Sequence, residues 1–237
     1  MNRLIKVGIA TFALAAAVPA FAEEAEEEAS GAIGWTPVAF GLASPVQLPW
    51  GLAKWDVFGL DLNLFYSDAP LMYGLGIGGL GMTTRDTMAG LQVAGLFNYA
   101  MDEDVYGMRL TLGANISQGT VYGVEAGGFG YRKNFWGLDL EFLGSFQDEL
   151  WGWQMSGLVN ITKKQLYGFQ GAIGVNIAEV AYGCQLAGIF NMANELHGCQ
   201  IGIVNFAERC PWGFQIGIVN IIMDNQLKVL PIVNAYF

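Results

Sequence analysis

Trp212-Gly213-Phe214-Gln215-Ile216-Gly217-Ile218-Val219-Asn220 is the clearest copy of a unit of about fifteen residues that recurs along most of this chain. Other clear copies begin at Trp151 and at Tyr182, and a degenerate copy runs from Lys228 to Phe237. A glycine leads each copy: Gly59, Gly74, Gly90, Gly107, Gly123, Gly137, Gly152, Gly168, Gly183, Gly198 and Gly213. Consecutive glycines are 14 to 17 residues apart. A fixed period means that one structural unit is used many times, so this unit decides the fold.

Polar and apolar residues alternate within each repeat. Counted from the leading glycine, the odd offsets are apolar or glycine nearly everywhere, as in Met108, Leu110 and Leu112. Offset two is polar, with Gly76 as the exception, and offset eight is asparagine in the best copies. Alternation with a period of two is the mark of a strand with two different faces. One face is therefore expected to be apolar and the other polar or small.

Three details modify this pattern. In the fifth and sixth repeats, Tyr131 and Ser145 replace the asparagine. Asn205 and Asn220 stand at offset seven, and a bulge near Gly202 and Gly217 would return them to the polar face. An aromatic residue precedes most of the leading glycines: Phe58, Tyr73, Tyr106, Tyr122, Trp136, Trp151, Tyr167, Tyr182 and Trp212. Most charges of the repeat region stand in the turn-like segments between these strands, such as residues 132–134 and 162–165.

The pattern predicts an all-β fold, an antiparallel transmembrane β-barrel of about twelve strands with one strand per repeat. About ten strand residues at ~3.3 Å each, tilted by roughly 40°, cover an apolar band of about 25 Å. The apolar face would meet lipid, and closure would satisfy every backbone donor. The side chains expected to line the lumen are Arg109, Glu125, Asp139, Glu141, Gln154, Gln170, Gln185, Gln200 and Gln215. The terminal aromatic Phe237 is similar to the assembly signal of bacterial outer-membrane barrels.

A soluble β-solenoid explains the same period, with each repeat as one coil and the asparagines stacked in a ladder. Three features count against it: no corner signal interrupts the ten strand-like residues, no constant polar turn marks a second corner, and an outward face of Trp, Phe, Leu and Met would be exposed. Turning that face inward would remove the third objection. The solenoid therefore remains the alternative.

Two pairs of residues discriminate between these folds. Cys184 and Cys199 stand at the same offset of consecutive repeats. They would be neighbours in a parallel solenoid but about 25 Å apart in an antiparallel barrel, which predicts that no disulfide joins them. The barrel also predicts that Gln170→Lys is tolerated, whereas Ile173→Lys costs about 2–4 kcal/mol near the bilayer midplane.

The N-terminal sequence predicts secretion. Arg3 and Lys6 precede a short apolar stretch and the small-x-small site that ends at Ala22, so residues 1–22 are expected to be a signal peptide. Residues 23–50 would form an acidic tail and a lead segment, and residues 51–237 the repeat-built barrel. Without Arg3 and Lys6, 9 basic residues face 21 acidic ones, a net charge near −12 that argues against a nucleic-acid partner.

The residues offer little catalytic chemistry. The single histidine, His197, occupies an aromatic position, and Cys184, Cys199 and Cys210 lack the spacing of a metal site. Glycines at 76, 78, 79 and 81 lack the lysine and helix of a phosphate loop. Arg109, Glu125, Asp139 and Glu141 are interpreted as a cluster that neutralises itself, or as a constriction that sets the selectivity of a pore. No enzymatic activity, metal or cofactor is predicted.

The tandem aromatic-Gly-x-Gln repeats resemble a family of bacterial surface-repeat proteins. The segments 45–48, 55–66 and 230–234 are similar to it too, so the resemblance covers about Pro45 to Phe237. It implies secretion, a place at the cell surface or outer membrane, and no catalytic residues. The expected function is a porin-like, narrow passive pore or a structural membrane protein. Its expected partners are outer-membrane lipid, the barrel-assembly machinery and small solutes. The alternative is a secreted soluble β-solenoid that binds a protein or carbohydrate.

Overall fold

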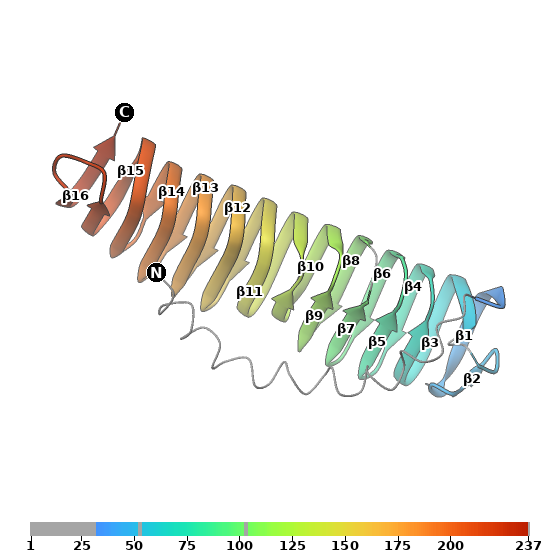
Figure 1. The fold of residues 1–237 in the computed structure, drawn as a ribbon. Helices are drawn as coiled ribbons and strands as arrows, with labels where there is room; N and C mark the ends of the chain where they lie inside the picture. The colour runs from blue at the N-terminus through green and yellow to red at the C-terminus, as the bar shows by residue number, and fades with distance from the viewer. Residues whose placement is uncertain (1–31, 52–53, 102–103, 237) are drawn as a thin grey trace. The chain divides into compact units, whose positions relative to one another are not determined.

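The computed structural model describes residues 32–51, 54–101 and 104–236. The expected signal peptide, the acidic tail and Phe237 lie outside these described residues. The unit Ile33–Phe237 is a β-solenoid, a single sixteen-stranded sheet wound into stacked coils (Figure 1). Its strands are β1 (Gly34–Ala43), β2 (Val46–Leu48), β3 (Trp55–Ala69), β4 (Met72–Gly78), β5 (Gly81–Thr84), β6 (Met88–Ala94), β7 (Phe97–Ala100), β8 (Val105–Thr111), β9 (Ala114–Ser117), β10 (Thr120–Tyr131), β11 (Asn134–Ser156), β12 (Val159–Ala172), β13 (Val175–Ala187), β14 (Phe190–Ile201), β15 (Val204–Ile222) and β16 (Val229–Tyr236).

Consecutive repeats pair in parallel, which overturns the antiparallel barrel. Gly168 in β12 lies opposite Gly183 in β13, and Gly183 opposite Gly198 in β14. The same glycine-to-glycine register joins β3, β4, β6, β8, β10 and β11. One repeat is therefore one coil, and the twelve antiparallel strands predicted from the alternation are wrong. The alternative, a solenoid with stacked asparagines, is the fold of this chain.

Each coil turns at two places that alternation alone does not reveal. In the coil formed by residues 159–174, the chain runs through residues 159–162, passes a register shift between Thr162 and Gln165, bends at Gly168 and returns through 169–172. A second corner at residues 173–174 separates β12 from β13. Because residues on both stretches alternate in and out, the coil keeps the period of two that was interpreted as one continuous strand.

The leading glycine is the corner signal that the sequence analysis did not recognise. Gly168 has φ +129°, and a Cβ there would lie 2.2 Å from the carbonyl oxygen of Gly152 in the preceding coil. All eleven leading glycines of the described repeats share this positive φ. Only glycine adopts such an extended, positive-φ backbone without strain, and only glycine allows this close approach of neighbouring coils. The glycine column therefore both bends the chain and sets the close stacking.

The register corrects the asparagine column in one place and confirms it in another. Gly130 lies opposite Asn115 and Ser145, so Gly130 and not Tyr131 stands in for the fifth asparagine. Asn205 lies opposite Asn191 and is fully buried, as the expected return to the polar face requires. The register changes by one residue at the corner beside Gly202, as expected: Leu186 lies opposite Ile201, fifteen residues on, whereas Asn191 lies opposite Asn205, fourteen residues on. The spacing returns to fifteen between Glu195 and His197.

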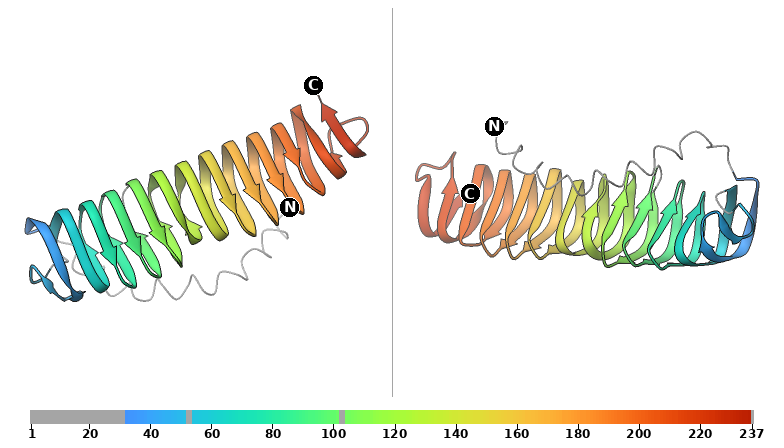
Figure 2. Two further views of the ribbon diagram at one scale, coloured as in Figure 1. Left: turned by 180° about the vertical axis from the view of Figure 1, so that it is seen from behind. Right: turned by 90° about the horizontal axis from the view of Figure 1, so that it is seen from below.

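Different strands close the two ends of the stack (Figure 2). At one end β1 pairs in parallel with β3, and β2 folds back against β1. At the other end β16, which contains most of the degenerate last repeat, pairs antiparallel with β15. The last strand therefore departs from the parallel pattern and covers the edge of the final full coil.

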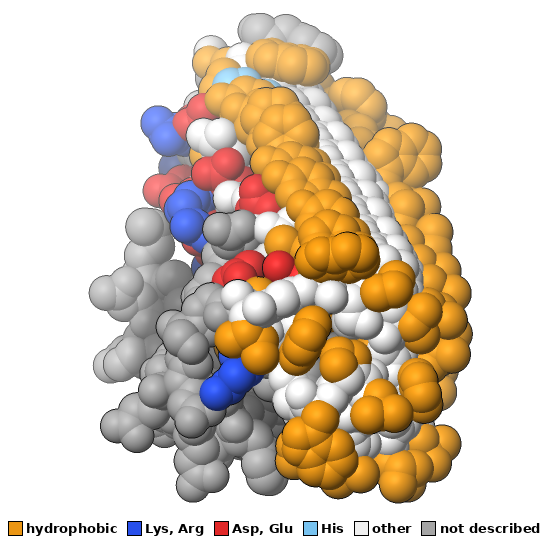
Figure 3. Space-filling model, turned by 90° about the vertical axis from the view of Figure 1, so that its right-hand side faces the viewer, with side chains coloured by type: hydrophobic (Ala, Val, Ile, Leu, Met, Phe, Trp, Pro, Cys, Tyr) orange, Lys and Arg blue, Asp and Glu red, His pale blue; other side chains and the backbone are white. Residues whose placement is uncertain are grey.

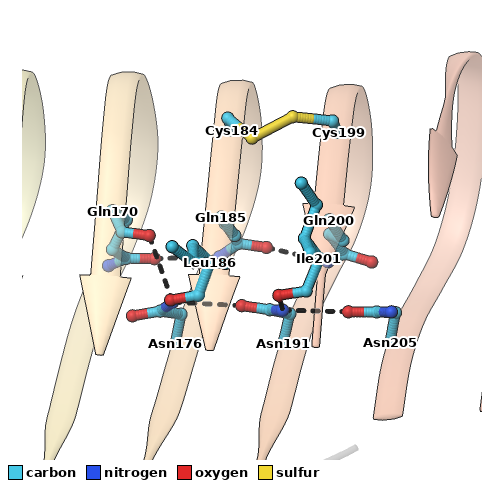
Figure 4. Close-up of a disulfide and its surroundings, with 10 residues drawn as sticks. All are labelled: Gln170, Asn176, Cys184, Gln185, Leu186, Asn191, Cys199, Gln200, Ile201 and Asn205. Atoms are coloured by element: carbon cyan, nitrogen blue, oxygen red, sulfur yellow. Dashed lines mark hydrogen bonds between the residues drawn. A yellow bond between two sulfur atoms is a disulfide. The ribbon is translucent and has the colours of Figure 1, made fainter. Parts of the chain in front are cut away.

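Cys184 and Cys199 form a disulfide between β13 and β14 (Figure 4). Their Cα atoms are 4.6 Å apart, because equal offsets of consecutive repeats lie side by side in a parallel stack. The separation of about 25 Å expected from an antiparallel barrel is wrong. The third cysteine, Cys210, is buried and unpaired.

The disulfide gives a direct test of the parallel register. With Cys210 replaced by serine, Cys184 and Cys199 are expected to form an intramolecular bridge under oxidising conditions, because their Cα separation lies within the usual disulfide range. Mass spectrometry of unreduced peptides would identify the bridge. A chain that also carries Cys184→Ser serves as the control, since its Cys199 should stay reactive to maleimide. Two free thiols in the oxidised parent would contradict the stacking described here.

Candidate functional site

The glutamines of the repeat form a ladder in the interior. The side chains of Gln154, Gln170, Gln185, Gln200 and Gln215 are fully buried. From Gln170 to Gln215, each amide nitrogen donates to the glutamine oxygen of the preceding coil, at 2.9 Å for Gln185 to Gln170 and 2.8 Å for Gln200 to Gln185 (Figure 4). Gln154, the first of the five, donates instead to Asp139 and Gln147. These five residues were expected to line the lumen of a barrel, and that prediction is wrong. In the solenoid they point into the packed interior and stack on the equivalent residues of neighbouring coils. The expected tolerances are also reversed, because Gln170 is buried and Ile173 is 74% exposed.

The asparagines form a second ladder on the opposite wall of the coil. Asn176 donates from Nδ2 to Oδ1 of Asn191 at 3.0 Å, and Asn191 donates in the same way to Asn205 at 2.9 Å. Asn176 Nδ2 also donates to the backbone carbonyl of Leu186 at 2.8 Å, which ties the two walls of a coil together. A net stabilisation of about 0.5–1.5 kcal/mol for each such bond makes the ladders a large part of the interior energetics.

A buried ionic cluster replaces the ladders in the middle of the stack. Arg109, Glu125 and Asp139 occupy the glutamine column of three consecutive coils, and Glu141 lies two residues beyond Asp139. Arg109 forms an ion pair with Glu125. The predicted cluster of these four residues is thus brought together, in the packed interior and not in a pore. All four side chains are almost completely buried.

Arg132 is the member of this cluster that the sequence analysis placed in a turn. Its guanidinium lies 2.9 Å from Asp139, 3.2 Å from Glu125 and 3.5 Å from Glu141. The signal was present, because Arg132 follows Gly130 of the asparagine column by two residues and so points inward by the period of two. The cluster therefore contains two guanidinium groups and three carboxyl groups.

The electrostatics of the cluster favour one bound proton. Burial raises the pKa of Glu141 from 4.5 to about 8; Arg132 opposes this shift, and the charges of Asp139 and Glu125 add to it. Burial also works against the charge of Arg132, but Asp139, Glu125 and Glu141 more than offset it, so its pKa is raised. With Glu141 protonated, two positive groups face two negative ones. A buried cluster of this kind is stable only when its charges balance.

Glu125, Asp139 and Glu141 place three carboxylate oxygens within 4.8 Å of one another, a spacing that would suit a cation. The guanidinium of Arg132 already lies among these oxygens. Its charge repels a second cation, so the donor set fits an arginine better than a metal ion.

The raised pKa of Glu141 predicts that the solenoid is more stable in mild acid. The stabilisation from this proton is fully present below about pH 4.5, the unfolded pKa, and is lost as the pH rises through about 8. Glu141→Gln cannot ionise, so its urea midpoint, followed by circular dichroism, should fall less between pH 5 and pH 8.5. Glu179→Gln, at an exposed position of β13, is the control and should follow the parent chain. An equal decline in all three chains would exclude Glu141 as the titrating group.

Charged side chains of the repeats lie along one edge of the solenoid, here called the charged edge. In the C-terminal half it consists of Asp148, Glu149, Lys163, Lys164, Glu179, Glu195, Glu208, Arg209 and Asp224. Oppositely charged groups pair between some neighbouring coils, as in Lys163–Asp148 at 3.3 Å and Arg209–Glu195 at 2.6 Å. The edge is therefore mixed in sign and carries no basic stripe.

An aromatic column runs beside the charged edge. It consists of the residues that precede the leading glycines: Phe58, Tyr73, Tyr106, Tyr122, Trp136, Trp151, Tyr167, Tyr182, His197 and Trp212. Neighbouring rings stack nearly parallel, with centroids 4.8 Å apart for Trp136 and Trp151 and 3.8 Å apart for Trp151 and Tyr167. From Trp136 to His197 the rings thus cover the faces of their neighbours. Tyr122 and Trp136 are instead tilted by 37° with centroids 6.1 Å apart, and Ala89 interrupts the column. In Figure 3 this hydrophobic column separates charged side chains from further hydrophobic ones.

His197 belongs to this column, as the sequence analysis expected. Its ring stacks on Tyr182, with centroids 4.5 Å apart, and its Nε2 lies 2.7 Å from Oε1 of Glu195. Glu195 is also paired with Arg209. These contacts hold the ring in the stack.

The remaining outward positions are apolar on both flat faces. On the first face, outward residues alternate with the asparagines, as do Val175, Ile177 and Phe190. On the second face they alternate with the glutamines, as do Phe214 and Ile216. Between the faces, opposite the charged edge, the second corners form an apolar ridge: Leu80, Leu96, Leu112, Leu143, Leu158, Ile173, Ile189, Ile203 and Ile218. The most exposed of them, Leu112, is 86% exposed.

The interior of the solenoid thus contains the polar ladders beside a column of buried apolar residues that includes Val121, Leu166 and Leu196, and three of the four outer sides are apolar. Apolar patches on monomeric soluble proteins rarely exceed a few hundred Å². A surface that is apolar along both faces and along most of the ridge is therefore the candidate binding site of this chain. We call the two faces and the apolar ridge together the apolar surface. Near the last coils it includes a shallow groove lined by Ile203, Ile218 and Ile232.

Within the described ranges there is no helix of the length and apolar character that would let it cross a membrane. No protein-family model, curated protein or solved structure matches this chain.

Proposed function

We propose that this protein is a non-enzymatic, secreted repeat protein of the bacterial cell envelope that works by binding through its apolar surface. The observation that carries the proposal is the segregation of charge. Outward positions of both faces and of the ridge are apolar in coil after coil, and charged side chains gather on one edge. The expected signal peptide and the resemblance to bacterial surface-repeat proteins support the location.

A carbohydrate partner is the weaker candidate. Sugars bind to aromatic side chains by stacking on the open face of a ring. In the aromatic column the rings of Tyr167 and Tyr182 lie 4.8 Å apart and within 5° of parallel, so their faces are already covered. The stacked rings offer edges to a ligand, and the neighbouring faces offer aliphatic side chains. The geometry thus favours an apolar partner.

The proposal is tested by the behaviour of the purified chain without detergent. It should bind a hydrophobic dye and self-associate in aqueous buffer, because water contacts the apolar surface. A variant with Leu158→Ser, Ile173→Ser and Ile189→Ser should bind less dye and associate less. A matched control carries serine at Lys163, Lys164 and Glu179 of the charged edge and should behave like the parent. A folded parent that is monomeric and binds no dye would contradict the proposed function.

A further inference from the structure

We propose that the partner of the apolar surface is a lipid bilayer, with the long axis of the solenoid lying in the membrane plane. This inference rests on the proposed function and names the partner of the same surface. The apolar ridge would insert among acyl chains, the aromatic column would lie at the headgroup level, and the charged edge would face water.

The shape of the surface is the first argument for lipid. Both flat faces and the ridge between them are apolar, so the surface is convex and wraps around three sides of each coil. A folded partner, or a second copy of this chain, presents one surface and would cover one face while leaving the other face and the ridge in water. A fluid of acyl chains covers all three sides at once.

The arrangement of side chains around the coil is the second argument. From the charged edge, the chain passes the aromatic column at Tyr167, then the outward Phe169, and reaches the ridge at Ile173. Charged, aromatic and aliphatic residues therefore follow one another with increasing distance from the edge. Trp and Tyr concentrate at membrane–water interfaces, where one part of the side chain is apolar and another is wet.

The backbone is the third argument. Unpaired N–H and C=O groups are costly in hydrocarbon, and few structures avoid them. Here each coil pairs with the coils on both sides, and even the corners of the ridge are bonded: Leu158 N donates to Leu143 O at 3.0 Å, and Val175 N donates to Leu158 O at 2.8 Å. The amide nitrogens of the interior ladders donate to the neighbouring coil, as from Gln185 to Gln170 and from Asn176 to Asn191. The part of the solenoid that would enter lipid is thus already hydrogen-bonded.

The charged edge predicts which lipids suffice. Lys163 and Lys164 are paired with Asp148, and Arg209 with Glu195, so the edge offers no excess of positive charge. Binding by basic clusters requires anionic lipid and is screened by salt. Binding of this solenoid should instead occur on zwitterionic phosphatidylcholine and change little with salt.

The test is flotation of the purified full chain with phosphatidylcholine vesicles. The parent should float with the vesicles in 0.1 M and in 1 M salt. A variant with Ile173→Lys and Ile189→Lys on the ridge should lose at least tenfold in its partition coefficient. A matched variant with Glu179→Lys and Glu208→Lys on the charged edge adds lysines at the opposite side of the coil and should bind as the parent does.

A position-specific readout guards against misfolded variants. In a Cys210→Ser chain with the Cys184–Cys199 bridge intact, an environment-sensitive dye is attached at Ile173→Cys or at Lys163→Cys. Vesicles should shift the emission of the ridge dye to the blue and leave that of the edge dye unchanged. Equal responses at the two positions would contradict the proposed orientation.

The outcomes separate this inference from the proposed function. A parent chain that binds dye and self-associates but does not float with vesicles overturns the lipid partner and leaves a protein-binding surface. Stable dimers in solution that also prevent flotation would identify a second copy of the chain as the partner. A parent that neither binds dye nor self-associates overturns the proposed function itself. Flotation of the ridge variant at the parent level would exclude the ridge as the contact.

Discussion

Gly168→Ala is expected to prevent formation of a stable solenoid. The new methyl group would lie 2.2 Å from the carbonyl oxygen of Gly152, and the backbone at φ +129° is strained for any residue with a side chain. Relief would require the coils to separate and the ladders of Gln170 and Asn160 to lengthen. The loss is expected to be about 3 kcal/mol or more, a large part of the stability of a domain.

Gly171→Ala is the matched control for this substitution. Gly171 lies three residues further along the same strand, but it does not have a positive φ, and the nearest contact of an added Cβ is the movable ring of Phe169 at 2.9 Å. Its partner in the next coil is Leu186, so a side chain fits at this position. The urea midpoint of each variant, followed by circular dichroism, makes the comparison. Similar midpoints for both variants would contradict the role assigned to the glycine column.

Arg132→Leu is expected to destabilise the centre of the stack by about 3–5 kcal/mol, because it leaves buried carboxylates without their shared partner. Asp139 and Glu125 would lose ion pairs of 2.9 and 3.2 Å in a fully buried site. Arg209→Leu is the control on the charged edge. Arg209 is two-thirds exposed, and its pair with Glu195 should contribute no more than about 1 kcal/mol.

A second substitution distinguishes lost charge balance from lost packing. Combining Arg132→Leu with Asp139→Asn and Glu141→Gln removes the unpaired charge of Asp139 and the ionisable group of Glu141. This triple variant should recover part of the lost stability, measured by the same urea midpoints. If it is no more stable than Arg132→Leu alone, packing and not electrostatics accounts for the effect.

The sequence was sufficient to predict the all-β class and the repeat unit, and the equal offsets of Cys184 and Cys199 were recognised as the test of strand direction. The choice between barrel and solenoid failed for a physical reason. Alternation shows which residues share a face, but a strand that bends at Gly168 keeps the same alternation as a straight one. The polar face was assigned to water because burial of Gln170 is costly unless each amide finds a partner. Stacking of identical residues supplies those partners, and a single repeat does not display it.

The ionic cluster was predicted in part for a similar reason. Arg109, Glu125, Asp139 and Glu141 share the inward parity, so their grouping follows from the repeat. Arg132 was assigned to a turn because a charged residue beside Lys133 and Asn134 is typical of one. Arg132 stands two residues after Gly130 and therefore points to the same, inward side. The shorter fifth repeat concealed this relation.

The antiparallel pairing of β16 with β15 bears on how far this architecture can grow. Each coil offers the next one a row of N–H and C=O groups and the glycine column, and the last full coil also offers the amides of Gln215 and Asn220, so an uncovered last coil would accept the first coil of another molecule. Such head-to-tail contacts do not close on themselves and generate open filaments. By running against the direction of the stack, β16 ends this templating, and the number of repeats encoded in the chain becomes the length of the particle.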